Sequence, residues 1–209
     1  KRRRETMMRI TSIVPEGRTR YAVTVDGEGG FVLYQKELSE YRIREGEELS
    51  EETLAEIMRK VLPRRAKLRC LNLLKSRSYT EKQLAEKLRA GKYPEAVIEE
   101  ALSYVKSFGY VDDAAYARSY AEDQIEKKSV RRIAEELQRK GVDRGLIEEA
   151  LLFVQERDGG QDEEGMIRRL LEKKHFDPET ADFAEKRRIQ AFLMRKGFTA
   201  DGIRRAMNG

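Results

Sequence analysis

The sequence predicts a mainly α-helical protein in which three tandem three-helix repeats form an elongated array, preceded by a small antiparallel three-stranded sheet and a helix. Apolar residues recur in one register three times, 49 residues apart between the first two units and 56 between the last two. Their spacing within each unit fits helix faces, whereas the N-terminal residues alternate as strands do. Repetition at this interval indicates stacked copies of one unit. The register positions are Leu84, Leu88, Ile98, Ala101 and Leu102; Ile133, Leu137, Ile147, Ala150 and Leu151; and Ile189, Leu193, Ile203, Ala206 and Met207.

The N-terminal part of the chain differs in pattern from the rest. Apolar and polar residues alternate near residues 10–14, 21–25 and 31–33, with a glycine-rich turn before the last of these segments. Such runs predict a three-stranded antiparallel meander. Ser50 is then expected to cap a helix that ends at Pro63, because proline lacks the backbone donor that a helix interior requires.

The first helix of the first repeat is expected over residues 64–76, with Leu68, Leu71 and Leu74 on one side. Cys70 lies in the same apolar run and is the only cysteine of the chain. A disulfide framework or a thiolate metal cluster is therefore excluded. We expect Cys70 to be a small buried core residue.

Four residues at helix ends are interpreted as structural caps. Asp112 and Asp113 stand where an N-cap and a first-turn acid belong, at the start of the second repeat. Paired carboxylates can also bind a hard cation, but their position before a helical run favours capping. Gly141 and Gly197 follow the middle helices of the second and third repeats, where a left-handed residue closes a helix.

The third repeat contains seven more residues than the second, around Phe176. Asp177 followed by Pro178 is typical of an N-cap and first helical position, so we expect the excess to lengthen the middle helix. The last repeat should therefore sit differently from the first two. The predicted divisions are 1–63 for the sheet and helix, 64–110 for repeat 1, 111–157 for repeat 2, 158–162 for a flexible connector and 163–209 for repeat 3.

The composition bounds the class of protein. Charged residues make up 39% of the chain and hydrophobic residues another 39%, as in thin helical arrays with a large surface. No apolar run approaches the roughly 18 residues of a membrane span, and no apolar segment typical of an export signal follows the basic start. We therefore expect a cytoplasmic protein without a membrane partner.

Residue patterns for catalysis are missing from the sequence. His175 is the only histidine, and we expect it to be solvated at a helix end. The sequence has no nucleophile elbow, no phosphate-binding loop of the Walker A type and no dinucleotide-binding glycine motif. We predict that the protein is not an enzyme and uses no metal, nucleotide or other cofactor.

Basic residues repeat together with the apolar register. In repeat 2, Glu135 and Glu136 stand four residues from these cations and can pair with them, which would make this a solvated helix face. In repeat 3 the matching positions are Ala191 and Phe192, so repeat 3 is predicted to be more electropositive. A net charge of +5 alone does not decide the partner. The candidate partner or DNA contacts are Arg131, Arg132, Arg139 and Lys140 in repeat 2 and Arg187, Arg188, Arg195 and Lys196 in repeat 3.

Several segments of the repeats form an ordered set. These segments are Gly109-Tyr110-Val111-Asp112-Asp113, Ala114-Ala115-Tyr116-Ala117-Arg118, Arg131-Arg132-Ile133, Lys140-Gly141-Val142, Ile147 to Leu151 and Leu193-Met194-Arg195-Lys196-Gly197-Phe198. Taken together and in this order, they resemble the RecX family of bacterial recombinase regulators. The resemblance runs from about residue 64 to the end, and the strand-rich start resembles the extension of longer members.

This resemblance implies three tandem three-helix repeats and a non-enzymatic regulator of DNA recombination, DNA repair and the SOS response. Such a protein would bind the RecA filament on DNA and inhibit its recombinase, ATPase and co-protease activities. The implied partners are the RecA filament, single-stranded DNA and, as a further candidate, double-stranded DNA, and we expect a monomer. The alternative is a stand-alone DNA-binding protein, because three-helix units with a short turn also resemble helix-turn-helix modules.

Overall fold

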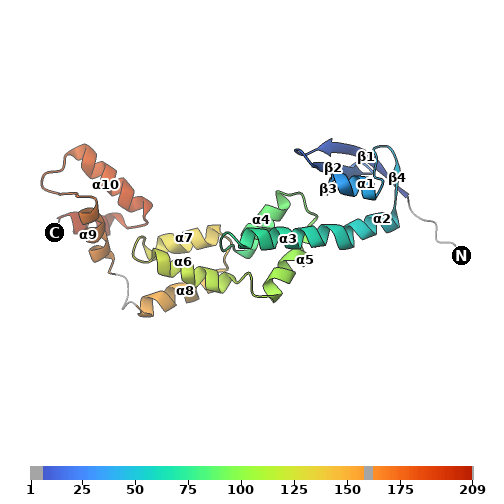
Figure 1. The fold of residues 1–209 in the computed structure, drawn as a ribbon. Coiled ribbons are helices and arrows are strands. Elements are labelled where there is room, and N and C mark those ends of the chain that lie inside the picture. The colour runs from blue at the N-terminus through green and yellow to red at the C-terminus, as the bar shows by residue number, and fades with distance from the viewer. Residues whose placement is uncertain (1–6, 158–161, 209) are drawn as a thin grey trace. The chain divides into compact units, whose positions relative to one another are not determined.

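The computed structural model describes residues 7–157 and 162–208. The chain divides into two compact units, Lys1–Val111 and Asp112–Gly209. The first unit contains the sheet and repeat 1, and the second contains repeats 2 and 3 (Figure 1). Within the described residues, no helix has the length and apolar character needed to cross a bilayer.

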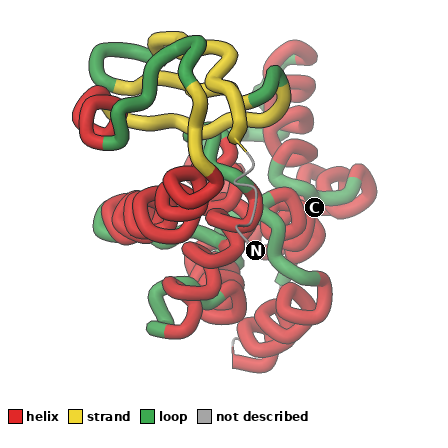
Figure 2. The backbone as a smooth tube through the Cα atoms, turned by 90° about the vertical axis from the view of Figure 1, so that its right-hand side faces the viewer, coloured by secondary structure: helices red, strands yellow, loops and turns green. Residues whose placement is uncertain are grey.

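The N-terminal sheet has four strands, so the prediction of three was wrong. The strand order is β3-β2-β1-β4 and each neighbouring pair is antiparallel (Figure 2). The additional strand is only three residues long, too short for alternation to reveal, and it exists because it pairs with the start of β1. The bounds are Met7–Pro15 for β1, Arg20–Val25 for β2, Glu28–Tyr34 for β3 and Glu48–Ser50 for β4, with helix α1 at Gln35–Glu40.

The helix that Ser50 caps does not end at Pro63, contrary to the prediction. It continues through a π-helical segment in which the Leu62 N–H donates to the Ile57 carbonyl, five residues earlier. This wider turn directly before Pro63 accommodates a ring that would crowd a regular α-helical turn. The bounds are Glu51–Glu56 for α2, Ile57–Val61 for the π-helical segment and Leu62–Leu74 for α3.

The buried side of α3 also differs from the expected one. Leu62, Ala66 and Cys70, spaced four residues apart, are at most 1% exposed, whereas Leu68 is 51% exposed. The small side chains at 66 and 70 fit where the helix packs most closely, in the same core as Leu33 of the sheet. Cys70 is buried as expected, and burial raises the pKa of its thiol to about 11. The sheet and repeat 1 thus share one hydrophobic core.

The prediction of three three-helix repeats is confirmed. In each repeat the first helix packs against the third. Repeats 2 and 3 each have a hydrophobic core of their own. The helices are α3, α4 (Glu81–Arg89) and α5 (Glu95–Ser107) in repeat 1; α6 (Asp113–Gln124), α7 (Val130–Arg139) and α8 (Arg144–Arg157) in repeat 2; and α9 (Glu163–Lys173), α10 (Phe183–Arg195) and α11 (Ala200–Asn208) in repeat 3.

The repeating apolar register forms these cores. Every register residue is buried except Ile189, which is partly buried. Gly141 and Gly197 have φ values of 90° and 91° after the middle helices. In repeat 1 the left-handed residue is Lys92, with φ 57°, so this corner is built differently from the other two.

The third repeat does have a longer middle helix, with 13 residues in α10 against 10 in α7. Its N-cap, however, is Asp182, so the prediction that Asp177 caps this helix was wrong. Asp177 accepts hydrogen bonds from the Glu179 N–H (2.9 Å) and the Thr180 hydroxyl (3.0 Å) and closes a separate turn. The expected connector at 158–162 lies outside the described residues except for Asp162, which caps α9.

Candidate partner-binding surfaces

The start of α6 is held by capping contacts. Asp112 is its N-cap, and the Asp112 carboxylate accepts a hydrogen bond from the Ala115 N–H at 2.9 Å. Asp113 is the acid of the first turn, where it faces the positive end of the helix dipole.

In the described part of the chain, no three His, Cys, Asp or Glu side chains gather into a potential metal site. His175 is exposed beyond the end of α9, with φ 53°.

The basic residues of repeat 2 are engaged with their own helix. Arg131 pairs with Glu135 at 3.1 Å, and Arg132 pairs with Glu136 at 3.0 Å. Arg139 donates to the Glu135 carbonyl oxygen at 3.3 Å. These contacts stabilise α7 and partly neutralise this face.

Glu136 connects three parts of repeat 2. It accepts hydrogen bonds from the Tyr120 hydroxyl (2.5 Å), the Lys128 ammonium (2.6 Å) and the Arg132 guanidinium (3.0 Å). Its side chain is only 14% exposed. Burial alone would raise the pKa of Glu136, but hydrogen bonds from Lys128 and Tyr120 outweigh it and hold that pKa below its ordinary value. We therefore assign Glu136 a structural role.

Lys140 lies against two aromatic rings of α6. Its ammonium is 5.1 Å from the centroid of the Tyr120 ring and 5.9 Å from that of Tyr116. The two rings are stacked, with centroids 6.2 Å apart. A cation over aromatic faces is positioned for electrostatic attraction to them, so Lys140 is a partly engaged member of the predicted set.

The three predicted arginines of repeat 3 are accessible. Arg187, Arg188 and Arg195 are exposed and make no ion pair with any residue that the structure describes. The Arg187 guanidinium lies 5.9 Å from the centroid of the Phe183 ring, which leaves its donors accessible. The structure thus supports the electrostatic contrast between the two repeats.

Lys196 differs from these arginines. It is half-buried, and its ammonium lies 5.5 Å from the centroid of the Phe192 ring. Burial lowers the pKa of its amine, and the nearby positive charge of Lys128 lowers it further. Its carbonyl accepts a hydrogen bond from the Ser129 N–H at 3.1 Å, which joins repeats 2 and 3 within the second unit.

The outer face of α10 combines positive charge with exposed apolar groups. Phe183 is 77% exposed and Met194 is 59% exposed. Arg187 and Gln190 lie between them at helical spacing, so these four side chains follow one face. Arg, Phe and Met are enriched in protein–protein interfaces. The α10 face therefore has the composition of a protein-binding surface.

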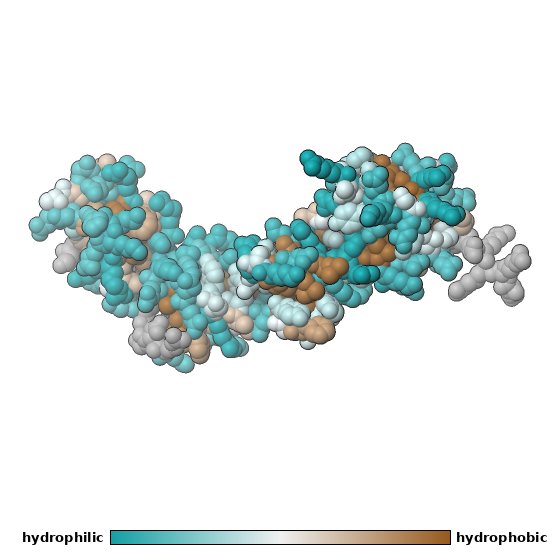
Figure 3. Space-filling view, in the orientation of Figure 1, coloured by the Kyte–Doolittle hydropathy of each residue, from teal (hydrophilic) through white to brown (hydrophobic). Residues whose placement is uncertain are grey.

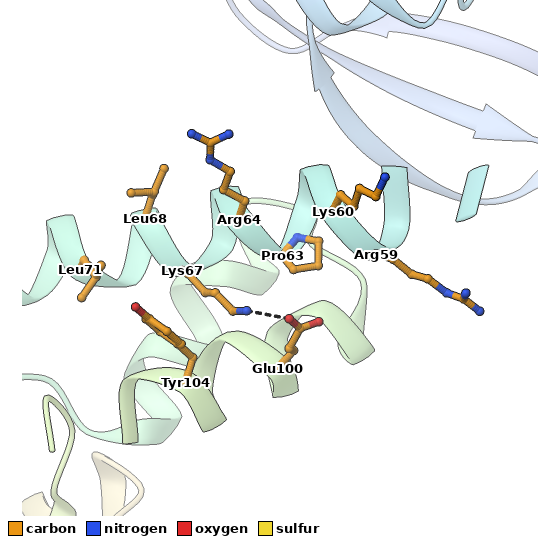
Figure 4. A pocket seen from close by; sticks show the side chains of 9 residues that line it. All are labelled: Arg59, Lys60, Pro63, Arg64, Lys67, Leu68, Leu71, Glu100 and Tyr104. Carbon is orange, nitrogen blue, oxygen red and sulfur yellow. Dashed lines mark hydrogen bonds and ion pairs between the residues drawn. The ribbon is translucent and has the colours of Figure 1, made fainter. Parts of the chain in front are cut away.

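The structure has a second basic surface, which the repeat register did not predict. Residues 57–80, which include α3, contain eight Lys or Arg residues and no Asp or Glu. This signal was available in the sequence, but it lies outside the recurring pattern and was missed. An open groove of about 370 Å³ between α3 and α5 is lined by several of these cations (Figure 4).

The fold and these surfaces define a class: a helical-repeat protein whose exposed features are basic and apolar contact faces. Comparison with known proteins identifies the family within this class. Three RecX family models match in order, the first three-helix domain at residues 66–104, the second at 112–151 and the third at 162–207. The chain belongs to the RecX family of regulatory proteins.

Individual relatives support this assignment. The regulatory protein RecX of Caldanaerobacter subterraneus subsp. tengcongensis is 32% identical over 203 residues, covering 96% of this chain and 99% of that protein. The regulatory protein RecX of Chromobacterium violaceum is 35% identical over 143 residues, covering 68% and 89%.

Two crystal structures share the fold. One of a regulatory protein RecX matches with a TM-score of 0.56 at 25% identity, covering 97% of this chain and 100% of that one. RecX from Lactobacillus salivarius matches with a TM-score of 0.53 at 22% identity, covering 70% and 94%.

Proposed function

We propose that this protein is a non-enzymatic regulator that binds the RecA nucleoprotein filament and inhibits its recombinase, ATPase and co-protease activities. The observation that carries the proposal is the ordered match of all three RecX three-helix domains. Relatives named regulatory protein RecX align over nearly the whole chain. The protein acts as a monomer, and its partners are RecA and the DNA within the filament.

The proposed contact with the filament is made by the α10 face together with the adjacent side of the same helix, which carries Arg188 and Arg195. Arg188 and Arg195 lie seven residues, or about 10 Å, apart along one side of the helix. The exposed Phe183 and Met194 side chains add apolar area that would be removed from water in a complex. Arginine binds carboxylates and phosphates through several donors, so this face suits either an acidic protein surface or the DNA backbone.

The basic residues of repeat 2 form the secondary part of the proposed interface. Arg131 and Arg139 are exposed, and their contacts on α7 are surface contacts that a partner can replace at little cost. Arg132 and Lys140 are less accessible, since each is held in the network around Tyr120 and Glu136. We expect these two residues to support the surface rather than to provide most of the binding energy.

RecA-catalysed ATP hydrolysis on single-stranded DNA, measured while the protein is titrated in, tests the proposal. Wild-type protein should inhibit at stoichiometric ratios, and absence of inhibition would refute the regulatory function. If the protein instead selected a defined sequence from a random duplex library without RecA, the stand-alone DNA-binding alternative would be supported.

The α10 surface is tested with a triple charge reversal, Arg187→Glu, Arg188→Glu and Arg195→Glu. A matched control reverses Arg144, Arg168 and Arg204, which are in the same unit but pair with acidic neighbours on their own helices. Both variants change net charge equally. The α10 variant should lose most of the inhibition while the control retains it, with circular dichroism confirming equal helix content. Equal inhibition by both would refute the α10 contact while leaving the regulatory function intact.

A further inference from the structure

The N-terminal unit carries a concentration of positive charge that the proposed filament contact does not use. Of the eight cations in residues 57–80, Arg65 is structural, because it donates to the Val32 carbonyl at 2.8 Å and pairs with Glu37 at 3.0 Å. Arg59 and Arg64 are exposed and have no ion-pair partner within residues 7–157 and 162–208. Most of this charge is therefore directed to solvent.

Several of these side chains line the groove between α3 and α5 (Figure 4). Arg59 and Lys60 project from the π-helical segment and Arg64 from α3. Lys67 lies between the helices, pairs with Glu100 at 2.7 Å and stands 5.1 Å from the centroid of the Tyr104 ring. Glu100 therefore neutralises one cation of the groove, and Lys60 pairs with Glu56 at 3.1 Å outside the lining. Arg59 and Arg64 keep the lining positively charged.

The groove is also apolar. Leu68 is 51% exposed on α3, and Leu71 and Pro63 contribute further carbon surface to the lining. In the space-filling view, hydrophobic surface lies over α3 and α5 beside hydrophilic side chains (Figure 3). Positive charge next to exposed carbon surface indicates a ligand that carries both negative charge and flat or apolar groups.

An aromatic cluster continues from the groove. The ring centroids of Tyr104 and Phe108 are 4.9 Å apart, and those of Phe108 and Tyr110 are 6.0 Å apart with only 17° between the ring planes. Phe108 is 59% exposed and Tyr110 is 55% exposed. All three belong to the first unit, at the end of α5 and in the segment directly after it. These rings form a platform with accessible faces.

We propose that this groove and platform bind single-stranded nucleic acid. The phosphates lie along Arg59, Arg64 and the neighbouring lysines, and the bases stack on the faces of Phe108 and Tyr110. A cationic groove combined with aromatic stacking surfaces is the usual means of binding single strands without sequence preference. A duplex is a poorer ligand, because its base faces are covered within its own stack. An acidic peptide would satisfy the cations but would not use the parallel ring faces.

This site extends the proposed function by giving DNA a contact in the first unit, but its argument does not depend on RecA. The test is therefore made with the full chain alone, by fluorescence anisotropy of a labelled oligothymidylate of about 20 nucleotides, long enough for the usual site sizes. The variants are Phe108→Ala and the pair Arg59→Ala with Arg64→Ala. Controls in the second unit are Phe153→Ala, which removes a ring that is 45% exposed, and Arg144→Ala.

The wild-type protein should bind the oligothymidylate more tightly than a duplex of equal length. Phe108→Ala should weaken binding about fivefold or more, the usual range for loss of one stacking ring. The double arginine variant should reduce the slope of log affinity against log salt by about 1.4, or about 0.7 for each lost phosphate contact. The controls should bind like wild type.

No binding at about 50 mM salt, where phosphate contacts are strong, would overturn the proposal. Unchanged affinity in Phe108→Ala, or a duplex bound as tightly as the single strand, would also overturn it. If the oligothymidylate did not bind but an acidic amphipathic peptide did, and the double arginine variant lost that peptide binding, the groove would be assigned to a protein partner instead. The RecA ATPase assay tests the regulatory function separately. If the Phe108 and arginine variants still inhibited RecA, the regulatory function would stand, and the oligothymidylate assay alone would decide the DNA site.

Discussion

Replacing Glu136 by glutamine should destabilise the second unit much more than the same change at Glu135, its neighbour on α7. Both carboxylates pair with arginines of the same helix. Glu136, however, is 14% exposed and also binds the Tyr120 hydroxyl and Lys128, whereas Glu135 is 44% exposed. The two substitutions therefore compare the loss of a partly buried ionic network with the loss of a surface ion pair on the same helix.

The magnitude follows from that difference in burial. Surface pairs contribute about 0.2–1 kcal/mol, and loss of one partner of a buried pair costs about 3–5 kcal/mol. Glu136 lies between these limits, so we expect Glu136→Gln to lower the free energy of unfolding by about 2 kcal/mol and Glu135→Gln by about 0.5 kcal/mol or less. In a unit of this size, the former corresponds to a fall in Tm of about 8–16 °C.

Thermal unfolding followed by circular dichroism at pH 7 measures both variants. The comparison is repeated at lower pH because the folded-state pKa of Glu136 is lowered from its ordinary value of 4.5. A carboxylate of this kind contributes stability above its unfolded-state pKa, and that contribution is lost as the pH falls through the folded-state pKa. The difference between wild type and Glu136→Gln should therefore shrink below about pH 4.5. Equal destabilisation by the two substitutions, or a difference that grows in acid, would refute the assigned network.

Three further predictions concern packing, chemistry and capping. Gly197→Ala should destabilise the second unit by about 1–3 kcal/mol through backbone strain and a steric clash, because the new Cβ would lie 2.5 Å from the Arg132 Cβ. Gly46→Ala is the control, because Gly46 also has a positive φ, 84°, but open space around it. Chemical denaturation should show a larger loss of stability for Gly197→Ala than for Gly46→Ala. Cys70, fully buried with a thiol pKa of about 11, should react with a thiol reagent at pH 8 only as the first unit unfolds, and rapid labelling of folded protein would contradict that burial. Asp112→Ala should cost about 1 kcal/mol of stability through the lost N-cap while RecA inhibition per folded molecule stays unchanged, and weaker inhibition at equal folded concentration would show a contact role instead.

Local rules explain why so much of the fold was predictable. The residues of the apolar register were correctly placed in the cores of the three repeats, with only Ile189 partly exposed, because a helix buries one periodic face wherever it packs. Gly141 and Gly197 could be placed at helix ends because the left-handed conformation they adopt excludes most other residues. Each of these features depends on residues within a few positions of one another.

The errors occurred where distant contacts override a local preference. Pro63 is a strong local signal to end a helix, yet the π-helical turn before it lets α2 continue into α3. Leu68 fits a local apolar stripe, yet the core uses Ala66 and Cys70 because they allow closer packing. Asp177 has the pattern of a helix cap, but its side chain closes a turn and Asp182 caps α10 instead.

The candidate contact residues also divide into features set by local sequence and features set by distant contacts. The absence in repeat 3 of the acidic partners found in repeat 2 could be read from the residues alone, because pairing at four residues along a helix is a local property. The contacts of Glu136 with Tyr120 and Lys128, and the half-buried position of Lys196 beside repeat 2, depend on the tertiary fold.

The same distinction applies to the first unit. The sequence contains the eight cations of residues 57–80 and the three aromatic residues near the end of α5. Only the packing of the distant helices brings Tyr104 of α5 beside four of these cations in one groove. Contacts with Val32 and Glu37 turn Arg65 inward. The physical reason is that charge and ring type are fixed by the residue itself, whereas exposure and proximity depend on which distant elements bury it. The sequence therefore determined the repeats and the chemistry available to them, and the tertiary structure decided which of those side chains are free to bind.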